Sequence, residues 1–335
     1  MTSAAILRAG RDDDAEGFIA LIDACWAEYP GCVMDLDGEV PELRALASYY
    51  AGQDGALWAA EVAGRVVGMV ATRPLRDGEE SWEICKMYAA REMRGGGLAH
   101  ALIEAAEAHA RTQGAQRMKL WTDTRFDRAH RFYEKRSYVR SGPIRALNDK
   151  SNSIEFAYTK PLAGVHVERL DAAGAASAEG CLALILKECV DNDASVSFLP
   201  PLVLDKAAAF WRRMAADVAG GRRVLLAAWV DGLLAGIVML DLDMPENQPH
   251  RADLQKLLVR PGIRRRGVGR LLMERIEQEA RDEGRRLLVL DTRAGDAAEP
   301  LYRGMGWQEA GRIPGFAVNA DGTLGDTVYF WKNVG

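Results

Sequence analysis

The sequence predicts an α/β protein of two domains, each a mixed, mostly antiparallel sheet flanked by helices. The chain has 335 residues, which is long enough for two ordinary domains with a core each. Hairpin signals and helix-length amphipathic segments alternate in both halves, and this pattern favours mixed sheets over purely parallel ones. One sequence pattern also occurs twice, once in each half.

The clearest part of this repeat is rich in glycine. The pattern Arg-x-x-Gly-x-(Gly/Ala) occurs at residues 94–99 and again at residues 264–269, each time between a strand-like run and a helix-like one. Just upstream, residues 83–89 align with residues 253–259 at the same spacing, so that an acidic residue, a lysine and the apolar positions coincide. The simplest explanation is a pair of related domains.

The repeat also indicates where the two domains lie. Residues 132–138 match residues 301–307 with one residue of slip, which carries the correspondence toward the end of each half. We therefore expect domains over residues 1–161 and 165–335, with a linker around residues 160–164.

In the first half, capping and turn residues mark the elements. Asp12 or Asp13 can cap the first helix, Pro41 suits the opening turn of the second, and the Ala-Gly-Arg turn at residues 63–65 is typical of a hairpin. The expected helices run from Asp12 to Glu28, after Pro41, from Leu98 to Arg111 and from Arg128 to Arg136. The expected strands are Ala4 to Arg8, Leu57 to Glu61, Val66 to Thr72, Trp82 to Ala89, Met118 to Trp121 and Ser153 to Thr159.

The second half repeats this order. Its hairpin turns at Asp231 and Gly232, where the sequence Asp-Gly favours a tight turn. The expected helices are Ala175 to Val190, Leu202 to Val218, Val268 to Asp282 and Ala297 to Met305. The expected strands, beside the two of the hairpin, are Val165 to Leu170, Arg251 to Val259, Leu287 to Asp291 and Thr327 to Trp331.

Composition narrows the classes of function. The net charge is −5 with acidic and basic residues interspersed, so we expect neither a general nucleic-acid surface nor a membrane surface. No apolar run approaches the length that crosses a bilayer and no signal-peptide pattern is present, from which we expect a cytoplasmic location. The five cysteines form no C-x-x-C pair, which favours reduced, buried thiols over disulfides or zinc ligands.

Each glycine segment is a candidate anion-binding loop, because glycine leaves backbone N–H groups uncovered and the following helix adds the positive end of its dipole. A dinucleotide-binding fold has the same order of strand, glycines and helix, but it requires G-x-G-x-x-G. Here residues 267–269 (Gly-Val-Gly) are followed by Arg270-Leu271-Leu272, without a third glycine, and the lysine and hydroxyl of a P-loop are absent.

Both glycine segments match the motif (Gln/Arg)-x-x-Gly-x-(Gly/Ala) of the GNAT superfamily of acyl-CoA-dependent N-acetyltransferases, and nearly the whole chain resembles two such domains. The resemblance implies acetyl-CoA as co-substrate, without a metal. It also implies that the loop backbones bind the CoA pyrophosphate and that the pantetheine arm enters a V-shaped gap between the fourth and fifth strands of each domain. The implied donor-binding residues are Met87, Ala89, Arg94, Gly95, Gly96, Gly97, Leu98 and Ala99 in the first half, and Leu257, Val259, Arg264, Arg265, Arg266, Gly267, Val268 and Gly269 in the second.

Acetyl transfer to an amine requires a neutral nitrogen. A lysine-like amine has a pKa of about 10.4, and lowering that pKa by three units costs about 4 kcal/mol. A carboxylate beside the amine can bind the ammonium form and relay its proton away. Glu83 and Asp253 occupy matching positions on the strand where the family often has its base. Asp291 and Asp123 end the next strands and are candidates for a second carboxylate, although such aspartates more often bind local backbone N–H groups.

The leaving CoA thiolate needs a proton, and a tyrosine with a pKa near 10 remains protonated at pH 7. Tyr133 and Tyr302 match the family's (Phe/Leu)-Tyr-x-x-x-Gly-Phe motif, whose tyrosine is the general acid; a buried helix aromatic is the alternative interpretation. The family often has Asn seven residues before this tyrosine, where Phe126 and Gly295 stand here, and Ser137 replaces the usual glycine of the motif.

The C-terminal half is also similar to tabtoxin-resistance-type acetyltransferases over residues 250–329, with Asp253 where that type commonly has Glu. This similarity suggests a small, amino-acid-like or toxin-like amine as acceptor.

We therefore expect an N-acetyltransferase that acetylates the primary amine of a small molecule by direct attack in a ternary complex, as a monomer or homodimer. The catalytic candidates are Asp253, Tyr302, Glu83, Tyr133 and Asp291. Two alternatives stay open. One half can be catalytic while the other is a structural or CoA-sensing module, or the whole chain can be a non-enzymatic acyl-CoA-binding protein.

Overall fold

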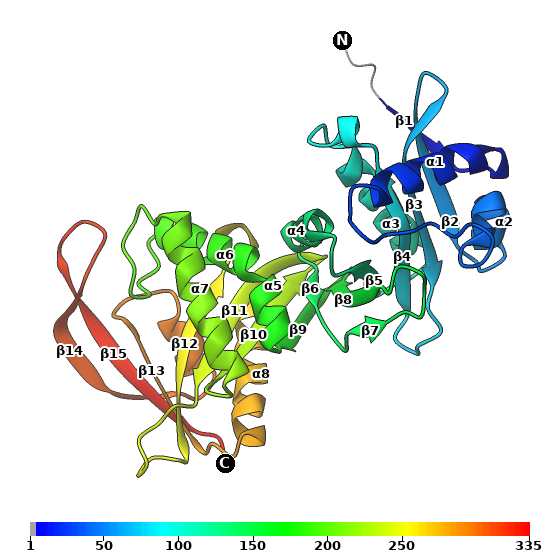
Figure 1. The fold of residues 1–335 in the computed structure, drawn as a ribbon. Coiled ribbons are helices and arrows are strands. Elements are labelled where there is room, and N and C mark those ends of the chain that lie inside the picture. Colours follow the sequence, from blue (N-terminus) through cyan, green and yellow to red (C-terminus); the bar gives the residue numbers. More distant parts are fainter. Residues whose placement is uncertain (1–4) are drawn as a thin grey trace. The chain divides into compact units, whose positions relative to one another are not determined.

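The computed structural model describes residues 5–335, which group into two compact units. The first unit contains the described residues up to Tyr133 together with residues 140–163, and the second contains residues 134–139 and 164–335. Each unit holds one mixed sheet with helices packed on it (Figure 1). The predicted fold class, mixed sheets flanked by helices, is confirmed.

Within residues 5–163, eight strands form a sheet in the order β1-β2-β3-β4-β5-β8-β6, with β7 paired to β8. β4 and β5 run parallel, whereas β1 to β4 pair antiparallel in sequence order and β5 pairs antiparallel with β8. The strands are β1 (Ile6–Ala9), β2 (Ala56–Val62), β3 (Arg65–Pro74), β4 (Ser81–Ala89), β5 (Arg117–Asp123), β6 (Val139–Arg140), β7 (Arg145–Ala146) and β8 (Ile154–Pro161). Of the predicted first strand, Ala4 lies outside the described residues.

Helices cover both faces of the first sheet. Met87 and Tyr88 are neighbours on β4, so their side chains point to opposite faces. Met87 contacts Tyr133 of α4, and Tyr88 contacts Trp26 of α1. The helices, with 3₁₀ turns marked η, are η1 (Asp12–Asp14), α1 (Ala15–Trp26), η2 (Pro41–Ala45), α2 (Leu46–Ala51), η3 (Arg91–Met93), α3 (Leu98–Thr112) and α4 (Asp127–Lys135).

The strands of residues 164–335 form a seven-stranded sheet in the order β14-β15-β13-β12-β11-β10-β9. Its parallel pair is β12 and β13, and the other neighbours are antiparallel. The strands are β9 (Val165–Leu170), β10 (Arg223–Val230), β11 (Leu233–Asp241), β12 (Arg251–Val259), β13 (Leu287–Arg293), β14 (Gln308–Val318) and β15 (Leu324–Asn333). The helices are α5 (Ala172–Ser177), α6 (Glu179–Asp191), α7 (Leu204–Ala219), η4 (Pro261–Ile263), α8 (Val268–Asp282) and α9 (Glu299–Gly304).

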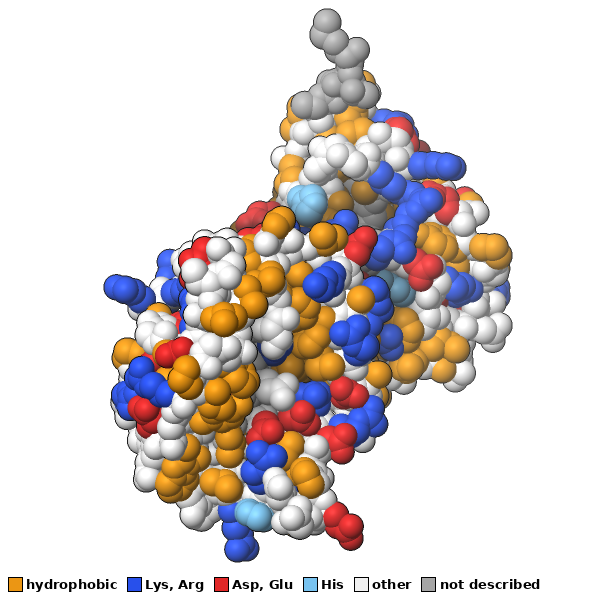
Figure 2. All heavy atoms as spheres, turned by 90° about the vertical axis from the view of Figure 1, so that its left-hand side faces the viewer, with side chains coloured by type: hydrophobic (Ala, Val, Ile, Leu, Met, Phe, Trp, Pro, Cys, Tyr) orange, Lys and Arg blue, Asp and Glu red, His pale blue; other side chains and the backbone are white. Residues whose placement is uncertain are grey.

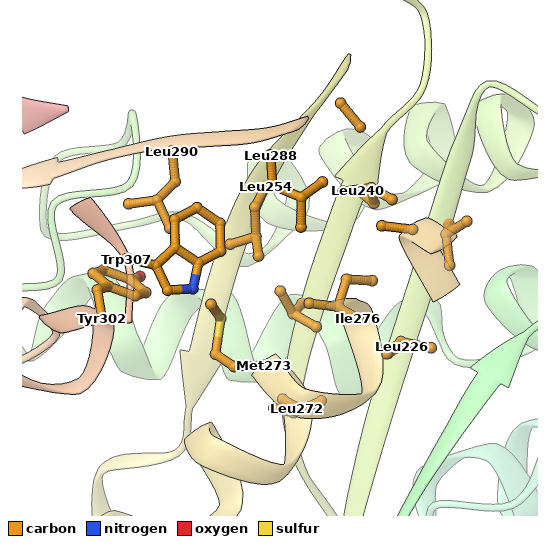
Figure 3. Packing of buried hydrophobic residues seen from close by; sticks show 14 of the residues in the cluster. Leu226, Leu240, Leu254, Leu272, Met273, Ile276, Leu288, Leu290, Tyr302 and Trp307 are labelled. Atoms are coloured by element: carbon orange, nitrogen blue, oxygen red, sulfur yellow. The ribbon is translucent and has the colours of Figure 1, made fainter. Parts of the chain in front are cut away.

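The main core of the second unit forms between α8 and the sheet. Leu272, Met273 and Ile276 recur at helical spacing, which places them on one face of α8, and all three are fully buried. Figure 3 shows them against β-strand leucines, with Tyr302 and Trp307 closing one end of the cluster. The predicted helix from Val268 to Asp282 has the observed bounds.

The other face of the second sheet is covered by α6 and α7. Cys189 and Trp211 are buried there with Trp229 of β10. The single helix predicted from Ala175 to Val190 is instead two, because α5 ends before Ala178 and α6 begins after it.

Strand β14 was not predicted from the sequence. All of its residues are exposed, so no hydrophobic alternation marks it, and Gly311, Pro314 and Gly315 interrupt it. Its pairing with β15 skips from Ile313 to Ala317, which accommodates the Pro-Gly segment outside the ladder.

Residues 134–139 belong to the second unit and are hydrogen-bonded within it. The indole N–H of Trp229 donates to the Ser137 carbonyl at 2.9 Å, and the backbone N–H of Leu234 donates to the Ser137 hydroxyl at 3.1 Å. Val139 is buried in the same cluster as Trp211.

The visible surface carries charges of both signs. Figure 2 shows acidic, basic and apolar side chains interspersed over one face of the molecule. Among residues 5–335, none of the helices has the length and apolar character needed to cross a membrane.

An ion pair between a buried glutamate of a helix and a lysine of the sheet occurs in both units at matching positions. Lys160 of β8 binds Glu107 of α3 at 2.5 Å, with 3% and 1% of the two side chains exposed. Lys332 of β15 binds Glu277 of α8 at 2.7 Å, and Glu277 also accepts from the Trp307 indole. In each unit this pair ties a long helix to the sheet beneath it.

We predict that Lys160→Met lowers the free energy of unfolding of the first unit by about 3 kcal/mol, because the buried Glu107 carboxylate loses its ion pair of 2.5 Å and keeps the longer one of 3.4 Å with Arg111. Urea unfolding monitored by circular dichroism measures the loss. The double variant Glu107→Leu, Lys160→Met should recover most of it, since no charge then remains in the core. If the double variant is no more stable than Lys160→Met, the ion pair is not the cause.

Candidate functional site

The parallel strand pair of the first sheet separates part-way along. Residues 81–84 of β4 pair with residues 117–120 of β5, but β4 continues to Ala89 and β5 to Asp123. At about 3.3 Å per residue, the part of β4 beyond the last pair, residues 85–89, offers roughly 16 Å of backbone edge that does not pair with β5.

The second sheet opens in the same way. Residues 251–253 of β12 pair with residues 287–289 of β13, after which β12 continues to Val259 and β13 to Arg293. Both units therefore contain a gap between two parallel strands, at the carboxyl ends of those strands.

A β-bulge lies on the edge of each gap. In the first sheet, Met69 pairs with Tyr88 and Ala71 with Cys85, so that Lys86 and Met87 together oppose one residue of β3. Lys86 has a φ of 46°, in the left-handed region that a bulge of this kind normally fills with glycine.

The second sheet repeats this bulge. Met239 pairs with Gln255 and Ile237 with Leu258, so that Lys256 and Leu257 oppose one residue of β11. Lys256 has a φ of 54°. A non-glycine residue in this conformation is strained, and the same strained bulge recurs at the matching position of both units.

The two glycine loops, residues 94–97 and 264–267, have matching backbone conformations. In the first, Gly95 and Gly97 have φ values of 79° and 87°; in the second, Arg265 and Gly267 have values of 64° and 82°. Each loop is exposed and leads into a 15-residue helix, α3 or α8. No described side chain caps either helix start, so the N–H groups there are open to an anion.

A cavity of about 390 Å³ lies against the glycine loop of the first unit. It is bounded by the free edge of β4, the loop, the start of α3, the end of α1 and helix α4. The lining residues are Cys25, Trp26, Tyr29, Met87, Tyr88, Ala89, Met93, Arg94, Gly95, Gly97, Ala99, His100, Phe126, Arg128, Ala129, Phe132 and Tyr133. The cavity thus collects residues that are distant in the sequence.

Most of the donor-binding residues expected in the first half line this cavity. Met87, Ala89, Arg94, Gly95, Gly97 and Ala99 are among its walls. Gly96 lies in the same loop, and Leu98 is buried at the first turn of α3. The Arg94 guanidinium binds Glu28 through two hydrogen bonds of 2.7 Å, which holds the loop to the end of α1.

Tyr133 stands inside the cavity and is 6% exposed. Its hydroxyl lies 3.8 Å from the Met87 sulfur, at the free edge of β4. Burial raises the pKa of the Tyr133 phenol above its ordinary value of 10.0. The group is therefore protonated at neutral pH, as a proton donor must be.

One wall of the cavity is aromatic and was not predicted from the sequence. Trp26 and Tyr88 are joined by a hydrogen bond of 3.0 Å from the indole N–H to the hydroxyl, and the rings of Tyr29 and Phe126 lie 4.6 Å apart. In the sequence, Phe126 is marked only by standing where the family motif has Asn. The concentration of aromatic residues at the end of the first helix was the available signal.

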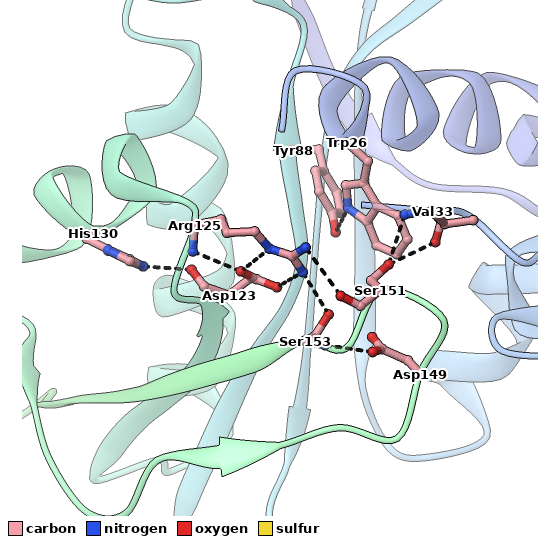
Figure 4. Close-up of polar contacts among 9 residues, drawn as sticks. All are labelled: Trp26, Val33, Tyr88, Asp123, Arg125, His130, Asp149, Ser151 and Ser153. Atoms are coloured by element: carbon pink, nitrogen blue, oxygen red, sulfur yellow. Dashed lines mark hydrogen bonds and ion pairs between the residues drawn. The ribbon is translucent and has the colours of Figure 1, made fainter. Parts of the chain in front are cut away.

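Asp123 is occupied by local partners. The backbone N–H and the guanidinium of Arg125 both donate to its carboxylate, at 2.8 and 2.5 Å. Figure 4 shows Arg125 reaching from there to Ser151 and Ser153, which in turn hold Val33 and Asp149. This network fixes the loops beside the aromatic wall, and it is the local arrangement expected of an aspartate at a strand end.

Glu83 lies outside the cavity walls and is paired with a cation. Arg73 on the neighbouring strand donates to its carboxylate from Nε at 2.9 Å and lies 2.7 Å from it through Nη2. The Glu83 side chain is 10% exposed.

In the second unit, Asp253 and Asp291 lie on β12 and β13 where the strands begin to separate. Asp253 binds Arg251 at 2.8 Å, and Asp291 accepts a hydrogen bond of 3.0 Å from the Thr327 hydroxyl. Burial raises the pKa of Asp253; Arg251 opposes this effect, and the nearby carboxylates of Asp241 and Asp291 add to it.

Tyr302 lies on the opposite face of this sheet. It is 5% exposed and packs in the core beside α8, with its ring 6.1 Å from that of Trp307. Burial raises the pKa of its phenol, and the charges of Asp296 and Asp291 raise it further. The structure therefore places the tyrosine and the two aspartates on either side of the strand gap.

The other expected donor residues of the second half surround the same gap. Leu257 and Val259 pack partly buried against the core, and Val268 is buried at the start of α8. Arg264 donates from Nε to the Val259 carbonyl at 3.2 Å, whereas Arg265 and Arg266 are exposed. Gly269 follows on the first turn of the helix.

A family model described as the acetyltransferase (GNAT) family matches the chain twice, over residues 18–138 and 193–307. The chain belongs to this family. The two GNAT matches contain the two glycine loops, the two bulges and both tyrosines.

Two curated relatives share part of the sequence. N-acetyltransferase 8F1 of Rattus norvegicus is 29% identical over 102 residues, which are 30% of this chain and 44% of the relative. An uncharacterized N-acetyltransferase in the hisH-hisA intergenic region of Azospirillum brasilense is 35% identical over 96 residues, which are 28% of this chain and 57% of the relative. The chain thus spans about half the length of these GNAT relatives.

Solved structures match about half of the chain each. The protein yncA of Salmonella typhimurium, solved with its cofactor acetyl-CoA, is 18% identical, covers 51% of this chain and 95% of its own, and has a TM-score of 0.43. A GNAT acetyltransferase of Streptococcus pneumoniae and a ribosomal-protein-alanine N-acetyltransferase of Brucella melitensis are each 22% identical, cover 50% of this chain and 99% of their own, and have a TM-score of 0.42.

We predict that Gly97→Ala lowers the free energy of unfolding of the first unit by about 1 kcal/mol, because alanine resists the left-handed conformation at that position. A methyl group there meets no atom within 4 Å, so backbone strain is the cause and not a clash. Gly96→Ala is the matched control, since Gly96 does not have a positive φ. Equal losses in urea unfolding for the two variants would contradict the assigned conformation of the loop.

Proposed function

We propose that this protein is an acetyl-CoA-dependent N-acetyltransferase that acetylates the primary amine of a small molecule by direct attack in a ternary complex. The observation that carries the proposal is the cavity of about 390 Å³, which touches a glycine loop, the free edge of β4 and a buried tyrosine at once. A donor with an anionic diphosphate, a narrow arm and a thioester fits these three features in that order.

The glycine loops suit a diphosphate. Gly95, Gly97 and Gly267 each have open space where a side chain would stand, so an anion can approach the backbone N–H groups and the start of the helix. The exposed arginines at 265 and 266 add positive charge in the second unit. Bound acetyl-CoA supplies the acetyl group as a thioester.

The strand gaps suit the arm of the donor. Backbone groups of residues 85–89 and 254–259 lie beyond the last strand pairs and can hydrogen-bond an amide-bearing chain as a further strand would. Met87 and Leu257 face the tyrosine side of each gap, beside Tyr133 and the core that contains Tyr302.

The proposed proton transfers involve groups on the two faces of each sheet. Tyr133 and Tyr302, kept protonated by burial, are proposed to protonate the departing thiolate. On the other face, Asp253 has a raised pKa and is proposed to accept the proton of the incoming ammonium, with Asp291 as a second carboxylate. Glu83 has the matching position in the first unit, where it is paired with Arg73.

A division of labour between the halves is the second candidate. We propose residues 1–161 and 165–335 as the two functional domains, and their acceptor faces differ in chemistry. The first is walled by Trp26, Tyr29 and Phe126, whereas the second presents Asp253 and Asp291. This difference favours two acceptors, or one catalytic half with a donor-sensing partner. A cytoplasmic location fits either form of the proposal.

We predict that acetyl-CoA binds the full chain at two sites in isothermal titration calorimetry. Gly97→Asp and Gly267→Asp should each remove one site, because an added carboxylate repels a diphosphate at the loop. Gly78→Asp is the matched control: Gly78 also has a positive φ and open space, in the turn between β3 and β4, and should leave both sites intact. Absence of acetyl-CoA binding to the unmodified chain would reject the proposed function.

We predict that Tyr133→Phe and Tyr302→Phe lower kcat of their own unit at least tenfold for an acetylated amine, while the Kd for acetyl-CoA changes less than twofold. The rate is measured as thiol release with a panel of small primary amines. Tyr49→Phe, at an exposed tyrosine of α2, is the control. An unchanged rate for one variant removes that tyrosine from the mechanism.

A further inference from the structure

The two bulge lysines have the same backbone conformation but different surroundings. The Lys86 amino group lies 3.0 Å from the carboxylate of Glu42, and about a fifth of each side chain is exposed. Lys86 thus forms an ion pair with Glu42, which links β4 to η2. Lys256 has the equivalent position on β12, and its environment contains no such partner.

Among residues 5–335, no carboxylate lies within ion-pair distance of the Lys256 amino group. Its nearest polar partner is the Ser197 hydroxyl at 3.4 Å, and its other neighbours are the rings of Phe198 and Phe210 at 6.0 and 5.6 Å. The amino group therefore lies near two aromatic rings and has no carboxylate in ion-pair contact.

Lys256 also lies on the acceptor face of the second unit. Phe210 belongs to α7, which covers the face opposite to α8 and Tyr302. Asp253 and Asp291 share the Lys256 face, because Leu254 and Leu290, their neighbours on β12 and β13, point into the α8 core. If an amine on this face attacks a thioester in the gap, the thiolate leaves toward the opposite face, where Tyr302 lies.

The charge state of Lys256 agrees with this geometry. Burial lowers the pKa of its amino group to about 8; Asp291 on β13 raises it and Arg223 on β10 lowers it further. Lys206 of α7 stacks on the same Phe198 ring at 5.6 Å and adds a second positive charge nearby. A lysine with a pKa of about 8 is partly neutral, and therefore nucleophilic, at physiological pH.

We propose that Lys256 is a self-acetylation site, at which the chain transfers the acetyl group of its own bound donor to its own lysine. The proposal rests on the proposed function, since it requires a thioester in the gap between β12 and β13. Lys86, with its carboxylate partner, is not acetylated in this way.

The reaction is a simple acyl transfer. The neutral Lys256 nitrogen attacks the acetyl carbonyl, the N–C bond forms and the thioester C–S bond breaks. The nitrogen loses one proton, to Asp291 or to water, and the CoA thiolate gains one, from Tyr302 or from water. The products are N-acetyl-Lys256 and free CoA. Modification removes the positive charge and fills the space beside Phe198 and Phe210, so the modified unit has a blocked acceptor face.

The test uses the full chain incubated with acetyl-CoA and no added amine, followed by peptide mass spectrometry after cleavage at acidic residues. We expect the peptide that contains Lys256 to gain one acetyl group at least ten times faster than the peptide that contains Lys86. Lys256→Arg should abolish the label with an unchanged Tm, and Gly267→Asp should slow labelling of Lys256 to the rate of Lys86. Equal rates for the two lysines would overturn the proposal.

The pH dependence provides a second readout. Labelling of Lys256 should rise about tenfold from pH 7 to pH 9 and level off, because a pKa of about 8 makes the amine mostly neutral at pH 9. An ordinary exposed lysine, with a pKa of about 10.4, should rise about a hundredfold over the same range without levelling. The ordinary profile at Lys256 would contradict the site.

Calorimetry on the Gly97→Asp chain separates the two possible causes of failure. If this chain binds acetyl-CoA in its second unit but Lys256 stays unlabelled, the self-acetylation site is wrong and the proposed function stands. If the second unit does not bind acetyl-CoA, the donor site of that unit is wrong and the proposal fails with it.

Discussion

The separation of two parallel strands is the constraint on which the rest of this structure depends. A sheet is stable because each strand hydrogen-bonds the backbone N–H and C=O groups of its neighbour. A gap between two strands loses these hydrogen bonds over several residues. In both units the loss is confined to the carboxyl ends of one strand pair, β4 with β5 and β12 with β13, while their opening residues stay paired. A gap of this form is tolerable where something else supplies hydrogen bonds, so the fold itself prepares a place for an extended, amide-bearing molecule.

Around this shared frame, the two units have diverged in the residues that face the gap. The conformation of the glycine loop, the bulge, the length of the helix that follows the loop and the Glu–Lys pair are the same in both. In the first unit, aromatic rings line the cavity beside the gap, and Glu83 is paired with Arg73. The second unit keeps aspartates on one face and places a lysine among phenylalanines. Scaffold and chemistry thus vary independently, as expected when function resides in a few side chains on a common fold.

Much of this architecture could be predicted from the sequence, for identifiable reasons. Helix α8 has the predicted bounds because its apolar spacing is regular and Gly267 precedes it; strand β12 has them because Pro249 and Pro261 lie just outside its ends. Strand β14 has no buried side chain and so leaves no periodic signal. The glycine loops were recognisable because a short backbone conformation demands specific residues. The partners of Glu83 and Lys256 were not, since Arg73, Phe198 and Phe210 reach them through the tertiary fold and no spacing rule connects them.

The bulges have an evolutionary consequence. Gln255 and Leu258 are aligned with β11 on either side of the extra residue, so loss of the single codon for Lys256 would restore a regular ladder without turning any neighbouring side chain to the other face. The same holds for Lys86 in the other unit, between Cys85 and Tyr88. Deletion of this one residue would therefore remove the strained bulge and its amino group and leave the hydrophobic core unchanged. In evolution, either half could in this way lose its bulge lysine and still fold.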